Sequence, residues 1–346
     1  MKLKTITIIL LSFICFISCI KDNITEPEPE PGRRDYVWTI DTIDSFNPVY
    51  RIWGSSPTDI WAVSSGSLTD DIHHFDGKNW STDGIFRLLY PLSIWGFSSN
   101  NVYIGGANGK IWYFNGTKWN EMVSLTKDGH SDIFFDNIWG DSPNDLYAFG
   151  AYLDEKGYAN NSVIAHYNGS WSMLNTDGLI GIVERVFISE DKLLYIRTNR
   201  SGAGQFPDST LIYKFYKGEY TKLYGNRWTK GLQADIGIIN EEVYFILGNI
   251  IAKRINDQFD TILLIDDKNF YQRIWGRTSK DIFLLMTDGL AHYNGENIEY
   301  LFNFTHAVDK PWTQIYGGAI FENEVFFTVY EPPTDLNLIY HGILKE

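Results

Sequence analysis

The chain of 346 residues is poor in cysteine, in methionine and in positive charge. Its two cysteines, Cys15 and Cys19, lie near the N-terminus, so the remainder can form neither a disulfide nor a thiolate catalyst. Lysine and arginine number 29 against 43 aspartates and glutamates, which gives a net charge of −14. Because a surface this acidic repels a phosphate backbone, we expect no nucleic-acid partner.

Motifs of common enzyme chemistry are also absent from the sequence. It contains no phosphate-binding loop, no dinucleotide-binding fingerprint, no Ser/His/Asp constellation and no cysteine–histidine spacing that suits a metal. His74, His166 and His292 recur at one position of the repeat described below, so they are expected to pack in separate units and not to share an ion. We therefore predict no cofactor and no metal site, and we assign no catalytic residue.

Aromatic residues, by contrast, are abundant. The chain has 12 Trp, 21 Tyr and 22 Phe, and 44% of its residues are hydrophobic. Aromatic side chains suit strands better than helices, and the apolar content is high enough for a folded core. The composition therefore favours an all-β protein.

Residues 1–18 have the layout of a signal peptide, with two lysines, an apolar run and a small residue at the end. The apolar run, residues 6–17, is too short to cross a bilayer comfortably. The residues Phe-Ile-Ser-Cys at 16–19 resemble a bacterial lipobox, and this resemblance implies that Cys19 becomes the lipid-modified first residue of the mature protein. The alternative is an ordinary signal peptide with an incidental cysteine.

Residues 19–35 are predicted to form an acidic, proline-rich tether. The Glu-Pro alternation of residues 26–31 favours an extended polyproline conformation, and its charges repel one another. The residues Cys-Ile-Lys-Asp at 19–22 partly resemble the surface-export signal of Bacteroidetes lipoproteins. We accordingly expect an exported protein that is held to the outer membrane by its lipid, with display on the cell surface as the favoured orientation.

The rest of the chain, residues 36–346, repeats one unit about every 38 to 50 residues. Clear copies begin at Ile52, Ile94, Ile138 and Ile274, and weaker copies begin at Val186, Ile236 and Ile315. An Asn-Gly or Asp-Gly pair follows four of these starts, and such pairs form tight hairpin turns. Each unit is therefore expected to contain four strands, which is the composition of a β-propeller blade.

The last unit supplies only three strands before the chain ends at Glu346. The missing strand is predicted at residues 36–41, where Trp38 matches the tryptophan that opens the fourth strand of other units. Pairing of this N-terminal strand with the last unit would close the ring without an open edge. The sequence thus predicts one domain, a seven-bladed propeller whose last blade is closed by an N-terminal strand.

The motif Trp-Gly-Ser-Ser-Pro-Thr-Asp-Ile-Trp at residues 53–61 resembles the Trp-Gly-rich repeats of propellers found in bacterial exported lipoproteins. The resemblance covers residues 36–346 and implies the fold. It implies no particular activity, because functions vary within this family and propellers support many unrelated functions. The Ser-x-Asp-x-Gly-x-Thr-Trp pattern of sialidase propellers is not reproduced, which counts against a glycosidase.

Polar residues precede the first isoleucine or valine of all seven units, at the end of each innermost strand that is predicted to lie at the top of the propeller. They are Arg51, Ser93, Asn137, Arg185, Asp235, Arg273 and Gln314. We expect them to surround the mouth of the central channel, where three arginines could hold a carboxylate or another anion. The alternative is that the arginines pair with Asp235 and with channel water.

The variable connections are predicted to share one face of the propeller, the top, and to carry aromatic residues such as Phe86, Tyr90, Trp228 and Trp312. Exposed aromatic residues can stack on sugars or anchor a protein partner. The alternative is that they pack within their own loops. We include Tyr90, Trp228 and Trp312 among the candidate binding residues.

Three functions remain open at this point. The favoured hypothesis is an envelope lipoprotein whose top face binds a carbohydrate or a protein partner without catalysis. The second is an enzyme acting on a polysaccharide or an acidic sugar, with Asp235 as the aligned acid or base. The third is a scaffold of an envelope complex, with the sides of the sheets as contact surfaces.

Overall fold

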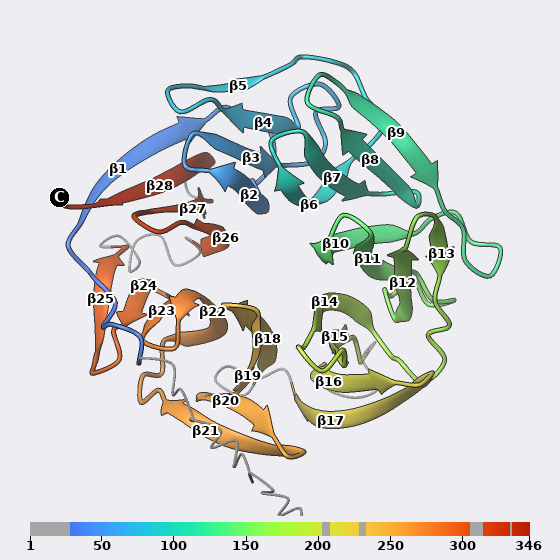
Figure 1. Ribbon diagram of the computed structural model, residues 1–346. Coiled ribbons are helices and arrows are strands. Elements are labelled where there is room, and N and C mark those ends of the chain that lie inside the picture. The colour runs from blue at the N-terminus through green and yellow to red at the C-terminus, as the bar shows by residue number, and fades with distance from the viewer. Residues whose placement is uncertain (1–27, 203–207, 228–232, 305–313, 333) are drawn as a thin grey trace, which may run out of the picture.

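The computed structural model describes residues 28–202, 208–227, 233–304, 314–332 and 334–346. These residues form seven four-stranded sheets, which are arranged as blades around a central axis (Figure 1). The predicted all-β, seven-bladed propeller is confirmed. No helix within the described ranges has the length and hydrophobicity needed to cross a membrane.

The first three blades follow one another along the chain, each with its first strand nearest the axis (Figure 1). Blade 1 comprises β2 (Arg51–Ser56), β3 (Asp59–Val63), β4 (Ile72–Phe75) and β5 (Trp80–Thr82). Blade 2 comprises β6 (Pro91–Ser98), β7 (Asn101–Gly106), β8 (Lys110–Phe114) and β9 (Trp119–Ser124). Blade 3 comprises β10 (Phe134–Ser142), β11 (Asp145–Tyr152), β12 (Asn161–Tyr167) and β13 (Trp171–Met173).

The other four blades continue around the ring. Blade 4 comprises β14 (Ile182–Ile188), β15 (Leu194–Arg200), β16 (Ser209–Tyr216) and β17 (Glu219–Arg227). Blade 5 comprises β18 (Ala234–Ile239), β19 (Glu242–Leu247), β20 (Ile250–Ile255) and β21 (Gln258–Leu264). Blade 6 comprises β22 (Phe270–Thr278), β23 (Asp281–Met286), β24 (Gly289–Tyr293) and β25 (Ile298–Asn303). Blade 7 comprises β26 (Gln314–Ile320), β27 (Glu324–Glu331), β28 (Leu336–Leu344) and β1 (Tyr36–Ile43).

Strand β1 closes the ring as predicted. It pairs antiparallel with β28 along its whole length, from Tyr36 opposite Leu344 to Ile43 opposite Asn337. The ring of Trp38 meets the edge of Phe302 in blade 6, with 5.0 Å between ring centroids. The first strand therefore joins blade 7 and also packs against blade 6.

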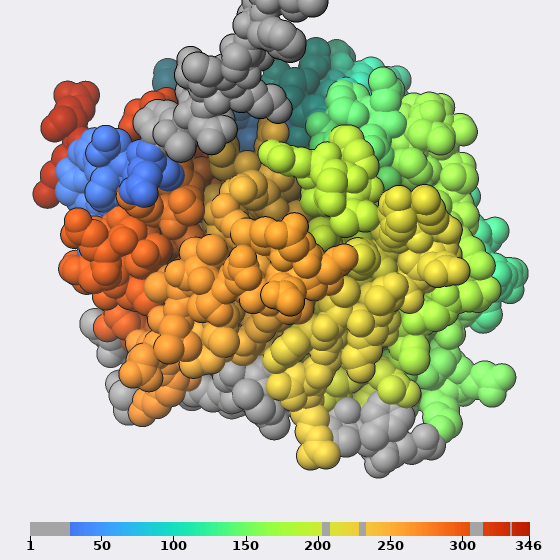
Figure 2. Space-filling view, turned by 60° about the horizontal axis from the view of Figure 1, so that its bottom comes forward, coloured from blue at the N-terminus to red at the C-terminus, as the bar shows by residue number. Residues whose placement is uncertain are grey.

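The segment that precedes β1, residues 28–35, lies against the bottom of blade 6, although the sequence assigns it to the tether. The bottom is the face that carries the turns between first and second strands and between third and fourth strands. The Gly32 amide donates to the carbonyl oxygens of Lys280 (2.9 Å) and Asn294 (3.3 Å), and the Lys280 ammonium contacts the Glu28 carboxylate at 2.7 Å. Figure 2 shows these blue N-terminal residues against the orange and red residues of the last blades. The chain thus reaches the propeller from its bottom face.

The repeated Trp-Gly pair joins neighbouring blades. A Cβ atom on Gly96 would lie 2.6 Å from the Trp53 ring of blade 1, so only glycine leaves room for that ring. One interface further, the Trp95 indole nitrogen donates to the Gly140 carbonyl oxygen at 3.1 Å. Close packing of this kind is sensitive to a single added methyl group. The repeat motif is therefore explained by packing between blades.

Blade 4 has Phe187 at the position of the tryptophan, whereas blades 5 and 7 have only the small residues Gly237 and Ala319 there. In each of blades 5 and 7 the residue two positions later covers the glycine of the next blade. Ile239 lies over Gly276, and Phe321 lies over Gly54, with 3.0 Å and 2.9 Å to the place that a Cβ would take. The same interface is thus filled from a different position of the strand.

The recurring histidines pack within their own blades, as expected. The Nε2 atoms of His74 and His166 lie 2.7 Å from carboxylate oxygens of Asp59 and Asp145, respectively. His292 Nε2 likewise lies 2.6 Å from Asp281. Each of these aspartates begins the second strand of its blade, and its carboxylate fixes the histidine ring of the third strand.

Candidate functional site

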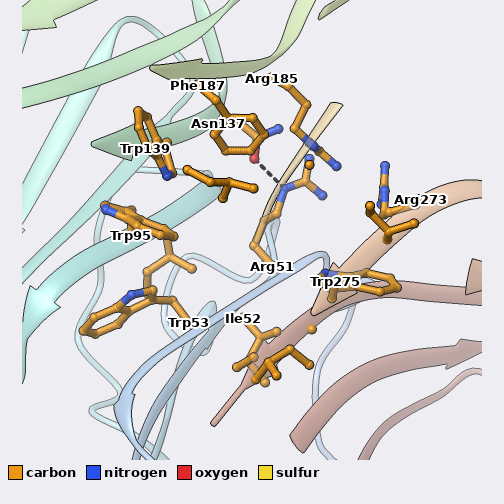
Figure 3. Close-up of a pocket in the computed structure, with 18 of the residues that line it drawn as sticks. Arg51, Ile52, Trp53, Trp95, Asn137, Trp139, Arg185, Phe187, Arg273 and Trp275 are labelled. Atoms are coloured by element: carbon orange, nitrogen blue, oxygen red, sulfur yellow. Dashed lines mark hydrogen bonds between the residues drawn. The ribbon is translucent and has the colours of Figure 1, made fainter. Parts of the chain in front are cut away.

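The innermost strands of all seven blades line one cavity of about 380 Å³ at the axis. Five of the seven predicted ring residues line it, namely Arg51, Asn137, Arg185, Asp235 and Arg273. Figure 3 shows the side chains of Arg51, Arg185 and Arg273 pointing toward one another. The structure therefore brings together three arginines that lie more than 80 residues apart in sequence.

Ser93 does not belong to this cavity. Its side chain is fully buried, and its hydroxyl donates to the Phe135 carbonyl oxygen at 2.9 Å. The short side chain bonds to the backbone of the adjacent blade and does not reach the axis. Blade 2 therefore contributes no polar side chain to the ring.

Gln314 is also misplaced by the sequence alignment. A bulge between Ile315 and Gly317 shifts the register of β26, so that Gly317 pairs with Thr328 as Arg51 pairs with Val63. Gly317 is therefore the ring position of blade 7, while Gln314 lies exposed at the start of the strand. The Ile-Tyr-Gly sequence at 315–317 imitates the Ile-Trp-Gly motif three residues too early.

Two further charged residues, Arg197 and Glu184, lie beside the arginines of the cavity, and we call all these charged residues the arginine cluster. Arg197, from the second strand of blade 4, forms an ion pair with Glu184, and its Nε donates to the Ala234 carbonyl oxygen at 3.0 Å. The sequence does show that Arg197 is a charged residue in the otherwise uncharged stretch 194–198, which could have marked it as a candidate. It does not show that the side chain extends to the backbone of blade 5.

Asp235 stands among three guanidinium groups. Its carboxylate oxygens lie 3.8 Å from Arg185 Nε, 3.8 Å from Arg197 Nε and 3.6 Å from Arg273 Nε. These separations are ion pairs and are longer than hydrogen bonds. The predicted pairing of arginines with Asp235 is therefore present, but it leaves hydrogen-bond donors of the arginines available.

Arg51 is held differently from the other arginines. Its Nε donates to Asn137 Oδ1 at 3.0 Å, and the Asn137 amide in turn donates to the Glu184 carbonyl oxygen at 2.8 Å. Within the described part of the chain no carboxylate oxygen lies within ion-pair distance of Arg51. The described hydrogen-bond partners of Arg51 are thus neutral groups, which do not offset its positive charge.

Burial and mutual repulsion shift the pKa values of this cluster. Burial, together with the neighbouring Arg273 and Arg51 charges, lowers the pKa of Arg185 to about 9, although the Asp235 charge opposes the shift. Burial also lowers the pKa of Arg51, and the Arg273 charge adds to the effect. Burial alone would raise the pKa of Glu184, but the surrounding arginines, Arg197 foremost, hold it below its usual range. The cavity therefore concentrates positive charge in an acidic protein.

Asp136, next to Asn137, is the exception among the carboxylates. Burial raises its pKa to about 7, although the Arg51 charge opposes the shift. One of its carboxylate oxygens is buried and accepts no hydrogen bond within the described residues. Such a group binds a proton more tightly in the folded than in the unfolded chain.

We expect Asp136→Asn to remove a pH dependence of stability. Protonated Asp136 makes its full contribution to wild-type stability below about pH 4, where the carboxyl is protonated in both the folded and the unfolded chain. This contribution is lost as the pH rises toward 7. The difference in unfolding free energy between the variant and the wild type should therefore shift in favour of the variant by about 4 kcal/mol between pH 4 and pH 8. Urea denaturation at the two pH values measures this shift. Asp260→Asn, at an exposed carboxylate of β21, is the control, and an equal difference at both pH values would contradict the assignment.

Of the three loop residues proposed as binding residues, the structure describes only Tyr90. It lies at the top face, is 37% exposed and has a positive φ of 49°, but it does not line the cavity. Trp228 and Trp312 lie outside the described residues. Tyr90 belongs instead to a group of exposed apolar side chains.

We call this group the apolar rim, defined as Phe46, Ile85, Phe86, Leu88 and Tyr90. Phe46 is 78% exposed and Phe86 is 61% exposed. Phe46 lies in the connection from β1 to β2, and the others lie in the connection from β5 to β6. Both connections belong to the top face, where the innermost strands begin.

A third top loop, residues 64–71, joins these two connections. Ser45 Oγ lies 2.8 Å from Ser64 Oγ on one side of the loop, and the Arg87 amide donates to the Leu68 carbonyl oxygen at 2.8 Å on the other. The Asp71 carboxylate accepts from the amides of Ser67 and Leu68 and fixes the loop. The loop 64–71 therefore lies between the other two connections and contacts both, and together the three loops support the apolar rim.

No protein-family model matches the chain, and no curated protein matches it. Solved structures, however, share its fold. YCF48 bound to D1 peptide has a TM-score of 0.60 and 13% sequence identity, covering 92% of this chain and 100% of that one. The chain is a seven-bladed propeller resembling YCF48 and WD40 propellers.

Two further structures support the same conclusion. YCF48 from Cyanidioschyzon merolae has a TM-score of 0.58 and 12% identity, covering 88% of this chain and 98% of that one. The WD40 β-propeller domain of Doa1 has a TM-score of 0.59 and 9% identity, covering 91% and 98%. At these identities the likeness to YCF48 and Doa1 concerns the fold alone.

Proposed function

We propose that this protein is a lipid-anchored envelope protein that binds a protein partner on its top face, without catalysis. The apolar rim is the observation that carries the proposal. Exposed apolar residues that gather on one surface are typical of interaction sites, whereas single ones are common anywhere. Aromatic anchors such as Phe46 and Phe86 supply much of the binding energy in protein interfaces.

The likeness to YCF48 favours a protein partner over a carbohydrate. One of the similar structures holds YCF48 together with a D1 peptide. A rim made largely of aliphatic and phenylalanine side chains also suits a protein surface better than a sugar, which needs polar groups beside its stacking platform. Carbohydrate binding therefore becomes the alternative outcome of the experiment.

The position of the N-terminal segment supports an orientation for the anchored molecule. If Cys19 carries lipid, the chain leaves the membrane there and meets the bottom of blade 6 at residues 28–35. The few residues between them span about 25 Å when extended. The bottom face would then be turned to the membrane, and the apolar rim would point away from it toward a partner.

The environment of Asp235 argues against the enzyme hypothesis. That hypothesis needs this carboxylate as an acid or base, but three arginine side chains surround it at 3.6 to 3.8 Å. The carboxylate is already engaged in ion pairs with three guanidinium groups of the chain itself. Asp235 is thus better explained as part of the arginine cluster.

The experiment compares two pairs of charge substitutions. The rim variant carries Phe86→Asp and Leu88→Asp at the top. The control carries Tyr216→Asp and Ile255→Asp, which lie at bottom hairpins and are similarly exposed, at 52% and 48%. Each purified propeller is coupled to beads and exposed to envelope extract, and retained proteins are quantified.

We expect a defined protein that is retained by the wild type and by the control but at least tenfold less by the rim variant. Equal retention by all three would overturn the proposal. Loss in the control alone would favour the scaffold hypothesis with another contact surface. Binding of the wild type to a glycan array, with no protein retained, would replace the protein partner by a carbohydrate.

A further inference from the structure

The central cavity combines two layers of different chemistry. Arg51, Arg185 and Arg273 lie at the ring position of their strands. Two residues further along, at the position that points to the same side of a strand, most blades carry an aromatic residue. We call these the aromatic belt, and they are Trp53, Trp95, Trp139, Phe187 and Trp275.

The aromatic belt is incomplete, which keeps the cavity open. Gly237 in blade 5 and Ala319 in blade 7 occupy the same position and also line the cavity. The glycine at the ring position of blade 7, Gly317, likewise leaves space beside the arginines. Small residues in two blades therefore create room for a ligand next to both layers.

The arginine layer has unmet charge and unmet hydrogen-bond capacity. The Nε atom of Arg273 is buried and donates no hydrogen bond to any described residue, since the Asp235 carboxylate stays 3.6 Å away. Among the described residues, Arg51 donates hydrogen bonds only to neutral groups. Buried donors without acceptors are costly, so an acceptor placed among them would be bound favourably.

The charge balance indicates an anionic ligand. The cluster has four guanidinium groups, from Arg51, Arg185, Arg197 and Arg273, and two carboxylates, from Glu184 and Asp235. Asp136, whose pKa is about 7, is only partly ionised at neutral pH. The cluster therefore has a net charge between +1 and +2, which one added carboxylate offsets wholly or in part.

We propose that the cavity binds an amphipathic carboxylate. Its carboxylate group accepts hydrogen bonds from Arg51, Arg185 and Arg273, and its apolar or aromatic body lies against the aromatic belt (Figure 3). The cavity of about 380 Å³ suits a small molecule of this kind. This site is separate from the apolar rim and does not depend on the protein partner.

The probe for the experiment is phenylacetate, which has the required charge and an aromatic body. Two matched compounds each lack one feature: phenylacetamide has no charge, and acetate has no aromatic body. Binding is followed by the fluorescence of the belt tryptophans and by calorimetry, in the absence of any partner protein. We expect phenylacetate to bind at least tenfold more tightly than either compound.

Variants connect the binding to the arginines. Arg273→Gln should weaken phenylacetate binding at least tenfold, and Arg273→Lys should weaken it less, because it keeps the charge but loses the planar fork. Arg227→Gln, at an exposed arginine of β17, should leave it unchanged. A thermal melt establishes that each variant is folded.

Several results would overturn the proposal. They are equal binding of phenylacetate and phenylacetamide, tighter binding of inorganic phosphate than of phenylacetate, and unchanged affinity in a folded Arg273→Gln. If Arg273→Gln does not fold, the comparison of the three compounds on the wild type and on Arg273→Lys decides the question. Failure here would leave the apolar rim experiment unaffected, since that experiment concerns different residues.

Discussion

A chain that begins at Asp44, and therefore lacks β1, is expected to lose most of its stability. Strand β1 supplies the fourth strand of blade 7 and buries Tyr36 and Ile43, while Trp38 packs on blade 6. Loss of three such side chains costs roughly 5 to 10 kcal/mol, which is comparable to the whole stability of a typical protein. We expect aggregation or a fall in melting temperature of more than about 15 °C.

The control for this experiment is a chain that begins at Glu28. It keeps β1 and the contacts of the preceding segment with blade 6. Circular dichroism should show β-structure with a cooperative melt, and size-exclusion chromatography should show no aggregate. If the chain beginning at Asp44 melts as cooperatively and as high as the control, strand β1 does not close the propeller.

Gly96→Val is expected to destabilise the propeller by about 3 kcal/mol. The added side chain would have to occupy the space of the Trp53 ring, which lies 2.6 to 2.8 Å from a Cβ at this position. The Trp53 ring would be forced out of the interface between blades 1 and 2. Urea denaturation, followed by tryptophan fluorescence, measures the loss.

Removal of the Trp53 ring, with which the new side chain would clash, provides the control for this prediction. In a Trp53→Ala background the space is already empty, so the further substitution Gly96→Val should cost less than about 1 kcal/mol. An equal cost in both backgrounds would show that the Trp53 ring is not the reason why glycine is required at residue 96.

The ring of blades could be predicted because it leaves a periodic trace in the sequence. Packing between blades requires a large residue on one blade and glycine on the next, and this requirement recurs as Trp53-Gly54 and its copies. The closing strand was predictable for the same reason. Trp38 matches the tryptophan that opens the fourth strand of other units, but it precedes the first unit, so its strand had to belong to the last one.

Blade 7 was misaligned because the periodic trace is weakest there. Ala319 replaces the motif tryptophan, and Phe321 fills the interface from a neighbouring position. The bulge at Ile315 then shifts the strand, so that Tyr316 lines the cavity and Gln314 does not. A bulge inserts a residue without a fixed sequence signature, and residue counting therefore fails across it.

The candidate sites were only partly predictable. Five ring residues reach the cavity because their position in the strand decides where they lie. Arg197 and Glu184 belong to the cluster through the reach of their side chains between strands, which no spacing in the sequence encodes. The apolar rim depends on contacts among irregular loops, and these have no period that could be recognised.

Photo-crosslinking tests the proposed function most directly. A photoreactive phenylalanine analogue is placed at Phe86 in the apolar rim, or at Tyr216 on the bottom face, and the protein is irradiated in the cells that produce it. We predict one discrete protein adduct from position 86 and none of that size from position 216. Adducts from position 216 alone, or identical adducts from both positions, would contradict a partner bound at the top face.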